Sequence, residues 1–462
     1  MRFSLGVIDY GVIALYFAAN LSVGFWFYRK NQNTSEMADY LLAGRGLSLP
    51  VFVAALVSSW YGGVLGVGEF SYRYGLLNWV VLGFPYYIFA LIYAYFLAPK
   101  IASSGALTLP ELLEKFYGSR ASGIGAALLL LLVSPAPYIL MIWVLVKSLA
   151  GISMWASFAV AMVSATAFLF VGGFRSDVRA DVLHFILMYS GLIVLPLAAY
   201  HAWGGLSFLR AHLPKTHLEW SGGKSLGYIG SWWFLGLWTL VEPTFYQKCL
   251  AAKSPEVARR GIVVSVLFWI LFDFITTVAG LYARAILPNL KDPVLSYPAL
   301  ADRILPPLWK GFFYVGMLGA IFAAFSSLAF LFASTLGKDI VWKFFKLPGL
   351  SETRHVQLGL IVGLVLGTAI AVVLPSVVDI WYTLSSIAVA GLLFPLCLGY
   401  FPSLKPLSED VIKIMIGGSG VSALWTLLKQ PLGLAPIYPG LMVACSFYLY
   451  SIFKKRMSYG AN

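Results

Sequence analysis

Long apolar segments alternate with short polar connections along almost the whole chain. Because a membrane-spanning helix needs about 20 predominantly apolar residues, this pattern predicts about 13 transmembrane spans. The spans are residues 7–28, 48–71, 76–99, 123–147, 152–172, 181–200, 227–247, 261–284, 308–336, 357–375, 379–401, 410–428 and 434–453. The sequence therefore predicts an all-α polytopic membrane protein whose outer surface contacts lipid.

Two of these spans are interrupted by polar residues and glycine. The second span contains Ser-Ser-Trp-Tyr-Gly-Gly at 58–63, and the seventh contains Gly230 and Gly236 ahead of Glu242. Unpaired peptide groups are costly in hydrocarbon, so a broken helix is tolerated only where protein or a water-filled cavity satisfies its backbone. We therefore expect a solute or ion site at the two breaks.

The spacing of the breaks predicts the domain organisation. They stand five spans apart, and since five is odd, spans 2–6 and 7–11 have opposite topology, as in inverted-repeat transporters. We expect a single transporter domain with a 5+5 inverted-repeat core. Its parts are an extra N-terminal helix and loop at 1–47, the first repeat at 48–200, the second repeat at 226–402, and two C-terminal helices at 403–462.

Composition and charge support a membrane protein and predict its orientation. Hydrophobic residues make up 60% of the chain and charged residues 11%, against about half and a quarter in soluble proteins. The net charge of +13 comes from Lys and Arg between apolar spans, so it reflects topology and not a nucleic-acid partner. An N-terminus outside the cell and a cytoplasmic C-terminus put 21 of the 32 Lys and Arg residues inside, as expected for the cell membrane.

The sequence holds no constellation that would support catalysis. The three cysteines have no CxxC spacing, the five histidines are scattered, and no phosphate-binding GxxxxGK[ST] motif is present. We therefore expect no enzyme activity, and the energy for transport must come from an ion gradient.

Several motifs, taken in order, resemble the sodium:solute symporter family. They are Tyr-Leu-Leu-Ala-Gly-Arg-Gly at 40–46, the Thr-Leu-Pro-Glu stretch at 108–118, Gly-Gly-Phe-Arg-Ser-Asp at the start of 172–181, Gln-Lys-Cys-Leu-Ala-Ala-Lys-Ser at 247–254, Ala-Ala-Phe-Ser-Ser-Leu at 323–328 and Lys-Asp-Ile at 338–340. The resemblance implies a five-plus-five fold like that of leucine-type transporters, and sodium-coupled symport of a small organic solute by alternating access.

The resemblance also implies a sodium site. Sodium is a hard cation that prefers oxygen ligands, which a broken helix and a facing helix can supply. The ligands would be the carbonyl oxygens of Leu56, Ser59 and Ala323 and the hydroxyls of Ser326 and Ser327. The alternative is that the two adjacent serines only bond backward into their own helix or permit close helix packing.

The family pattern further predicts one sodium per cycle. Some members hold a second sodium with hydroxyls at the places that are Ala329 and Phe330 here, and neither of these side chains can ligate a cation. Asp181 matches a carboxylate that attracts sodium on its exit path. The alternative for Asp181 is a solvated partner of Arg175 or Arg179.

Aromatic residues and one intramembrane carboxylate are the candidates for solute binding. Asp273 lies in the apolar run 263–277, where an ionised carboxylate is costly and therefore suggests a function. The structural alternatives are that the aromatic residues only pack or form an interface belt, and that Asp273 only makes a hydrogen bond between helices. A carboxylate beside aromatic rings suits an amine, through charge pairing and cation–π attraction. The predicted substrate-binding residues are Trp60, Tyr61, Gly62, Gly63, Trp238, Trp269 and Asp273.

Departures from the sugar-transporting members limit the solute. Where those members bind hydroxyl groups, this chain has Gly62, Gly63, Leu82 and Leu235, so a small amine, an amino acid or a largely apolar solute is favoured over a hexose. Two further carboxylates near the breaks are expected to pair with bases at span ends, Glu69 with Arg73 and Glu242 with Lys248.

Two other functions remain open from the sequence. One is a proton-coupled transporter with Asp273 or Glu69 as the proton carrier, and the other is a membrane sensor that binds solute without transporting it.

Overall fold

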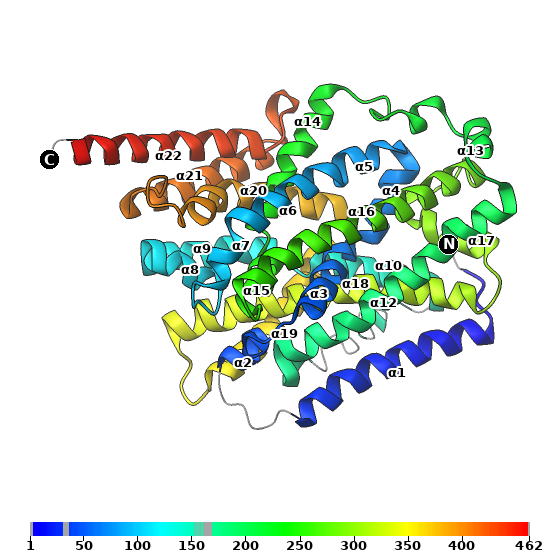
Figure 1. The fold of residues 1–462 in the computed structure, drawn as a ribbon, viewed down its shortest axis with the longest axis horizontal. Helices are drawn as coiled ribbons and strands as arrows, with labels where there is room; N and C mark the ends of the chain where they lie inside the picture. The colour runs from blue at the N-terminus through cyan, green and yellow to red at the C-terminus, as the bar shows by residue number, and fades with distance from the viewer. Residues whose placement is uncertain are drawn as a thin grey trace.

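The computed structural model describes residues 3–30, 37–151, 153, 155, 156, 159 and 169–460. Within these ranges the chain is a bundle of helices with no β-strand (Figure 1). One isolated β-bridge joins Leu47 to Ala252. Eight helical segments of the described chain are long and apolar enough to cross a membrane. The all-α membrane prediction is confirmed, whereas the count of 13 spans is not, and the predicted span 152–172 lies mostly outside the described residues.

The helices divide into long ones and short ones. The long helices are α1 Val7–Lys30, α6 Phe84–Phe96, α9 Ser119–Leu132, α10 Ala136–Ala150, α12 Leu169–Trp203, α16 Pro255–Ile286, α18 Trp309–Ser334, α19 Glu352–Val373, α20 Val377–Leu398, α21 Ser408–Leu427 and α22 Ile437–Gly460. The short α-helices are α2 Met37–Leu42, α3 Leu49–Trp60, α4 Val64–Tyr74, α5 Leu77–Leu82, α7 Ala98–Ala102, α8 Leu109–Tyr117, α13 Leu206–His212, α14 Leu226–Leu235, α15 Pro243–Ala251 and α17 Ser296–Ile304. The 3-10 turns are η1 Ala43–Arg45, η2 Tyr61–Gly63, η3 Lys215–Leu218, η4 Gly236–Val241, η5 Pro293–Leu295 and η7 Pro431–Gly433, and η6 Thr335–Phe345 is a π-helix.

Helix α18 is the centre of the bundle. It packs against α1, α3, α12 and α19, and the apolar part of its segment Trp309–Phe345 is entirely buried. Its contact with α12 is a backbone contact, because a Cβ added at Gly191 would lie 2.6 Å from the carbonyl oxygen of Phe312 and 2.8 Å from Cα of Gly316. Small residues allow such close helix crossings in membranes, and this one fixes α12 against the serine pair of α18.

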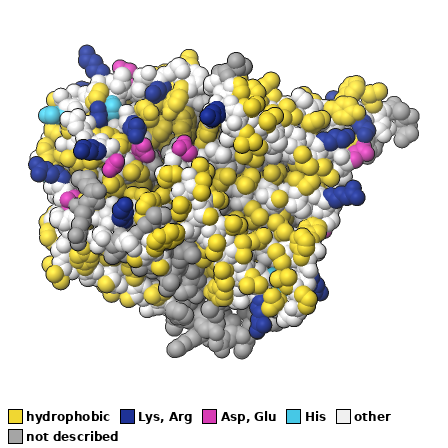
Figure 2. Space-filling model, turned by 180° about the vertical axis from the view of Figure 1, so that it is seen from behind, with side chains coloured by type: hydrophobic (Ala, Val, Ile, Leu, Met, Phe, Trp, Pro, Cys, Tyr) yellow, Lys and Arg dark blue, Asp and Glu magenta, His cyan; other side chains and the backbone are white. Residues whose placement is uncertain are grey.

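The outer surface of the bundle is apolar. Figure 2 shows hydrophobic side chains across the middle of one face, with most of the Lys and Arg side chains toward its left and right sides. Exposed apolar residues such as Leu197, Leu267 and Val365 contribute to this kind of surface, which suits a hydrocarbon environment.

Both predicted helix breaks are present, but each is shorter than expected. Helix α3 continues through Trp60, and only η2 departs from α-helix. Within α3 the hydroxyls of Ser58 and Ser59 bond back to carbonyls one turn earlier, at 2.9 and 2.7 Å. In the second break, η4 and an extended Glu242 precede α15, since the residue before a proline avoids the helical region. Gly230 lies inside α14 and does not break it.

The start of α12 differs from the prediction in a way that matters for the site. The polar stretch 172–181 was expected to precede a span beginning at 181, but α12 already begins at Leu169 and includes it, with a kink at Gly173 (φ 55°). A Cβ at Gly173 would lie 2.6 Å from the carbonyl oxygen of Tyr40. The helix therefore places Asp177 and Asp181 one turn apart on one face, inside the bundle.

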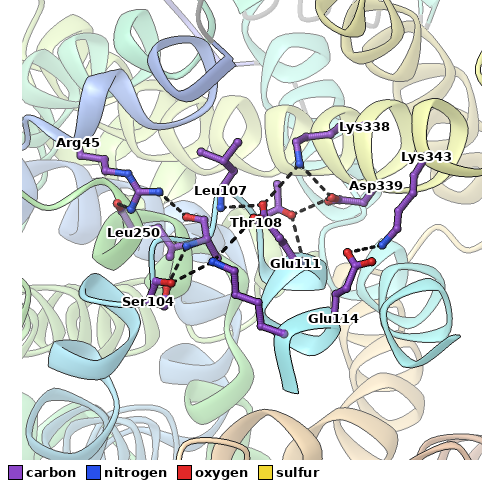
Figure 3. Close-up of polar contacts among 12 residues, drawn as sticks. Arg45, Ser104, Leu107, Thr108, Glu111, Glu114, Leu250, Lys338, Asp339 and Lys343 are labelled. Atoms are coloured by element: carbon purple, nitrogen blue, oxygen red, sulfur yellow. Dashed lines mark hydrogen bonds and ion pairs between the residues drawn. The ribbon is translucent and has the colours of Figure 1, made fainter. Parts of the chain in front are cut away.

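A polar network ties α8 to η6 at the end of α18 (Figure 3). The hydroxyl of Thr108 donates to the buried carboxylate of Asp339 at 2.7 Å, and Lys343 pairs with Glu114 at 2.5 Å. Arg45 donates to one backbone carbonyl before α8, at 2.8 Å, and to another in α15, at 3.4 Å. These bonds hold together segments that are far apart in the sequence.

Candidate functional site

A buried polar cluster forms where α12, α15 and α18 meet. The hydroxyl of Ser326 donates to Oδ1 of Asp177 at 2.6 Å, and the hydroxyl of Ser327 donates to Oδ2 of the same carboxylate at 2.8 Å. All three side chains are fully buried. The serine pair therefore does more than bond backward into its helix, where Ser326 has a longer contact of 3.2 Å to the carbonyl of Ala323.

Lys248 completes this cluster from α15. Its ammonium donates to the hydroxyl oxygen of Ser327 at 3.1 Å and lies 5.6 Å from the centre of the Phe174 ring. Its exposed fraction is 0%, which is rare for a lysine. The expected pairing with Glu242 is wrong: no ion pair joins the two residues in the part of the chain that the structure describes.

Asp181 lies one turn further along α12 and is also fully buried. Neither of its carboxylate oxygens has a hydrogen-bond partner among the described residues, and Oδ1 is 3.8 Å from Nδ1 of His184. The alternative of a solvated partner for Arg175 or Arg179 is wrong, because Asp181 has no exposure to solvent and Arg175 forms an ion pair with Asp39.

The predicted sodium ligands lie on elements that the fold brings together. Leu56 and Ser59 lie on α3, Ala323 and the serine pair on α18, and these two helices pack against each other. At the two positions where some family members hold a second sodium, both the side chains of this chain, Ala329 and Phe330, and their surroundings are apolar. Ala329 is buried, and the ring of Phe330 packs on the rings of Tyr40 and Phe174.

A cavity of about 160 Å³ lies at the two breaks. Aromatic residues dominate its lining, and two carboxylates, Glu242 and Asp273, complete it without any Lys or Arg among the described lining residues. The lining residues are Ser59, Trp60, Tyr61, Gly63, Gly66, Val67, Phe70, Leu82, Tyr86, Tyr138, Trp232, Leu235, Trp238, Glu242, Thr244, Asp273, Leu328, Trp381 and Tyr382.

The two carboxylates of the cavity are held by neighbouring hydroxyls. Tyr87 of α6 donates to Asp273 and receives a bond from the indole of Trp79 at 3.0 Å. Glu242 caps α15 and accepts from the hydroxyl of Thr244 at 3.0 Å. Both carboxylates are nearly inaccessible to solvent, and neither forms an ion pair with a described side chain. A cationic group that entered the cavity could therefore pair with either carboxylate.

Five of the seven predicted solute-binding residues line this cavity, and two lie behind it. Gly62 faces α18, where an added Cβ would lie 2.1 Å from Cβ of Ala324. Trp269 is buried behind Trp60, with ring centres 5.4 Å apart. The hydroxyl of Tyr61 donates to the carbonyl of Trp269 at 2.9 Å and so ties η2 to α16.

Sequence reasoning missed Asp177 and gave two further candidates, Lys248 and Glu242, another role as an ion pair at a span end. Asp177 has a signal in the sequence, since it precedes Asp181 by four residues and would share its face on a helix, but the polarity of the stretch 172–181 predicts a connection between spans. Glu69 was placed correctly, because it pairs with Arg73 at 2.9 Å.

The fold and the two buried sites define a multi-pass membrane transporter. The model of the sodium:solute symporter family matches residues 40–396. The chain belongs to this family, and it is a sodium-coupled secondary active symporter of a small organic solute, with sodium as its coupling ion, and not an enzyme.

Relatives with known names cover nearly the whole chain. The chain is 25% identical to the sodium/pantothenate symporter of Escherichia coli over 95% of its length and 94% of that protein's. It is 22% identical to the high-affinity choline transporter 1 of Caenorhabditis elegans (93% and 80% covered) and 26% identical to the osmoregulated proline transporter OpuE of Bacillus subtilis (94% and 92% covered).

Solved structures show the same fold. A sodium-coupled sialic acid symporter in a substrate-bound outward-open state superposes with a TM-score of 0.81 at 16% identity, covering 97% of this chain and 98% of that one. The nucleobase-cation-symport-1 transporter Mhp1 in an inward-facing conformation gives a TM-score of 0.58 at 13% identity, with 89% and 91% covered.

Proposed function

We propose that the transported solute carries a positively charged amine and binds in the cavity at the two breaks. The observation that carries this proposal is the charge of the lining: two buried carboxylates, Glu242 and Asp273, and no basic side chain among the lining residues that the structure describes. Two buried carboxylates are costly to ionise unless an opposite charge joins them. A cationic group of the solute supplies that charge, and an anionic solute would add to the repulsion.

The aromatic lining supports the same solute class. Rings of Trp60, Tyr86, Trp238 and Trp381 line the cavity beside the carboxylates, and aromatic faces attract ammonium groups, quaternary ones included. A cavity of about 150 Å³ holds a molecule such as benzene, so about 160 Å³ suits a small solute. Among the solutes for which the relatives above are named, choline and proline carry an ammonium group, whereas pantothenate does not.

We assign one sodium per transport cycle to the site formed by the carbonyls of Leu56, Ser59 and Ala323 and the hydroxyls of Ser326 and Ser327. The contact of α3 with α18 supports this assignment. Sodium bound there would favour the form of the protein that binds solute, and Asp181 would attract the ion on its way to the cytoplasm. The protein would lie in the cell membrane with its N-terminus outside and its C-terminus in the cytoplasm.

The solute class is tested with a matched pair of molecules. Choline and 3,3-dimethyl-1-butanol have the same shape, but only choline is charged. Thermal unfolding of the purified protein in sodium should show stabilisation by choline or a related amine and not by its neutral analogue. Glu242→Gln should weaken amine binding by about tenfold or more, since bonds to a charged group contribute about 1.5–3 kcal/mol, whereas Glu69→Gln serves as a control.

Two results would contradict the proposal. If the neutral analogue stabilises the protein as much as choline does, the charge of the solute plays no role. If only solutes with a carboxylate and without an amine bind, the site prefers a negative charge instead of a positive one. Amine uptake that follows pH and ignores sodium would instead favour proton coupling through Asp273.

A further inference from the structure

We propose that Asp177 is a carboxylate ligand of the coupling sodium, and that the ammonium of Lys248 is a tethered cation that sodium displaces from the same oxygens. This inference rests on the proposed sodium site between α3 and α18. It adds to that site one anionic ligand and one internal competitor, neither of which the serine-pair motif contains.

The geometry around Asp177 supports its role as a ligand. Its two oxygens accept one hydroxyl each, from Ser326 at 2.6 Å and from Ser327 at 2.8 Å. A serine that donates its only hydrogen to a carboxylate keeps its oxygen lone pairs for another partner. The two hydroxyl oxygens are thus oriented as acceptors by Asp177, and its carboxylate adds a hard, charged oxygen of the kind that hard cations prefer.

Lys248 already contacts one of these acceptors as a cation. Its ammonium, which has three donors and no acceptor, donates to Ser327 at 3.1 Å. This is the hydroxyl oxygen that the sodium needs. Two positive charges within about 4 Å repel each other strongly in a buried site. The hydroxyl oxygen of Ser327 can therefore bind either the sodium ion or the ammonium of Lys248, but not both at once.

Asp181 offers the displaced ammonium a place to go. Its carboxylate is fully buried, and both oxygens lack a hydrogen-bond partner among the described residues. It stands one helical turn from Asp177 on α12. A shift of the ammonium from Ser327 toward Asp181 would satisfy an unpaired carboxylate at the moment when sodium replaces the ammonium beside Asp177.

The charges of the cluster match one monovalent ion. Two carboxylates, Asp177 and Asp181, and one ammonium, Lys248, leave one net negative charge in a fully buried site. One sodium ion balances that charge, and a second one would leave the cluster positive. This count agrees with the apolar character of the second-sodium positions, Ala329 and Phe330.

The test is a sodium titration of thermal stability against potassium at constant ionic strength, in purified protein, for Asp177→Asn and Lys248→Met. Asp177→Asn should weaken the apparent sodium affinity by about tenfold or more, as expected for the loss of a charged partner. Lys248→Met should strengthen it, because a competitor has been removed. Lys310→Met removes another buried lysine, which pairs with Asp302 at 2.9 Å, and should lower stability without changing sodium affinity.

The outcomes separate this inference from the proposed sodium site. If Ser327→Ala abolishes the sodium response while Asp177→Asn and Lys248→Met keep the affinity of the unmodified protein, the sodium site stands and this inference is overturned. A weaker sodium response in Lys248→Met would also overturn it. If the unmodified protein shows no sodium response, the proposed sodium site itself fails. Should Lys248→Met not fold, Lys248→Gln removes the charge with a side chain that can still bond to Ser327, and the same gain in affinity is expected.

Discussion

The close contact between η2 and α18 predicts that Gly62→Ala will weaken sodium binding as well as destabilise the fold. An added Cβ at Gly62 would lie 2.1 Å from Cβ of Ala324 and 2.5 Å from a ring carbon of Tyr138. Since carbon atoms make favourable contact at about 3.5–4.0 Å, the two backbones must separate by about 1.5 Å. Overpacking of this kind typically costs about 1–3 kcal/mol.

The same displacement is much larger than an ion site tolerates. The proposed site takes ligands from both sides of this contact, Leu56 and Ser59 on α3 and the serine pair on α18, and ligand distances in metal sites hold to about 0.2 Å. We therefore expect a loss of sodium affinity of at least tenfold, which at saturating sodium removes about 1.4 kcal/mol of ligand stabilisation.

Gly230→Ala is the matched control. Gly230 lies within α14, and nothing lies within 4 Å of an added Cβ, so this change should be neutral or stabilise by about 0.4–1 kcal/mol. The measurement is the thermal unfolding midpoint of both variants over a range of sodium concentrations. A Gly62→Ala protein that responds to sodium with unchanged affinity would refute the argument that this contact sets the ion site.

Three further predictions concern single contacts. Asp9→Ala should lower the free energy of unfolding by about 1–2 kcal/mol, because the carboxylate accepts from two backbone N–H groups at the start of α18 at 3.0 and 2.9 Å, and sodium affinity measured in the same titration should not change. Thr108→Val should cost about 1–3 kcal/mol, since it leaves Asp339 without its hydroxyl donor, which chemical denaturation would detect. Tyr87→Phe should alter amine affinity several-fold in the binding assay while sparing the sodium response, because it removes a donor to Asp273 in the cavity.

The sequence was sufficient to predict an all-α membrane protein and the position of both breaks, because apolar length and backbone satisfaction are local requirements, but the count of 13 spans is not confirmed. It was not sufficient for the start of α12. Arg175, Asp177 and Arg179 make residues 172–181 too polar to read as part of a span. The structure accommodates this stretch because Asp177 faces hydroxyls of α18 and Arg175 pairs with Asp39, and such partners are supplied by distant parts of the chain.

The sequence was also not sufficient to predict whether a residue faces the cavity or a neighbouring helix. Gly62 and Gly63 are neighbours with the same chemistry, yet one packs on α18 and the other lines the cavity against the ring of Trp381, 2.4 Å from an added Cβ. Trp269 was expected to share the cavity with Asp273, one turn away. The ring of Trp60 separates it from the cavity, and only the packing of α3 on α16 determines that.

The position of α15 links the two sites and leads to a last prediction. This helix has nine residues, begins just after Glu242 at the cavity and carries Lys248 at the ion cluster. The ammonium of Lys248 interacts electrostatically with the carboxylate of Glu242, so a movement of this ammonium away from Ser327 changes the electrostatic field at the cavity. Coupling between two binding sites is reciprocal, so sodium should raise amine affinity by the same factor by which the amine raises sodium affinity. Calorimetric titration of each ligand with and without the other measures both factors. In Lys248→Met the two factors should fall together toward one, and a coupling factor unchanged from that of the unmodified protein would show that α15 does not carry it.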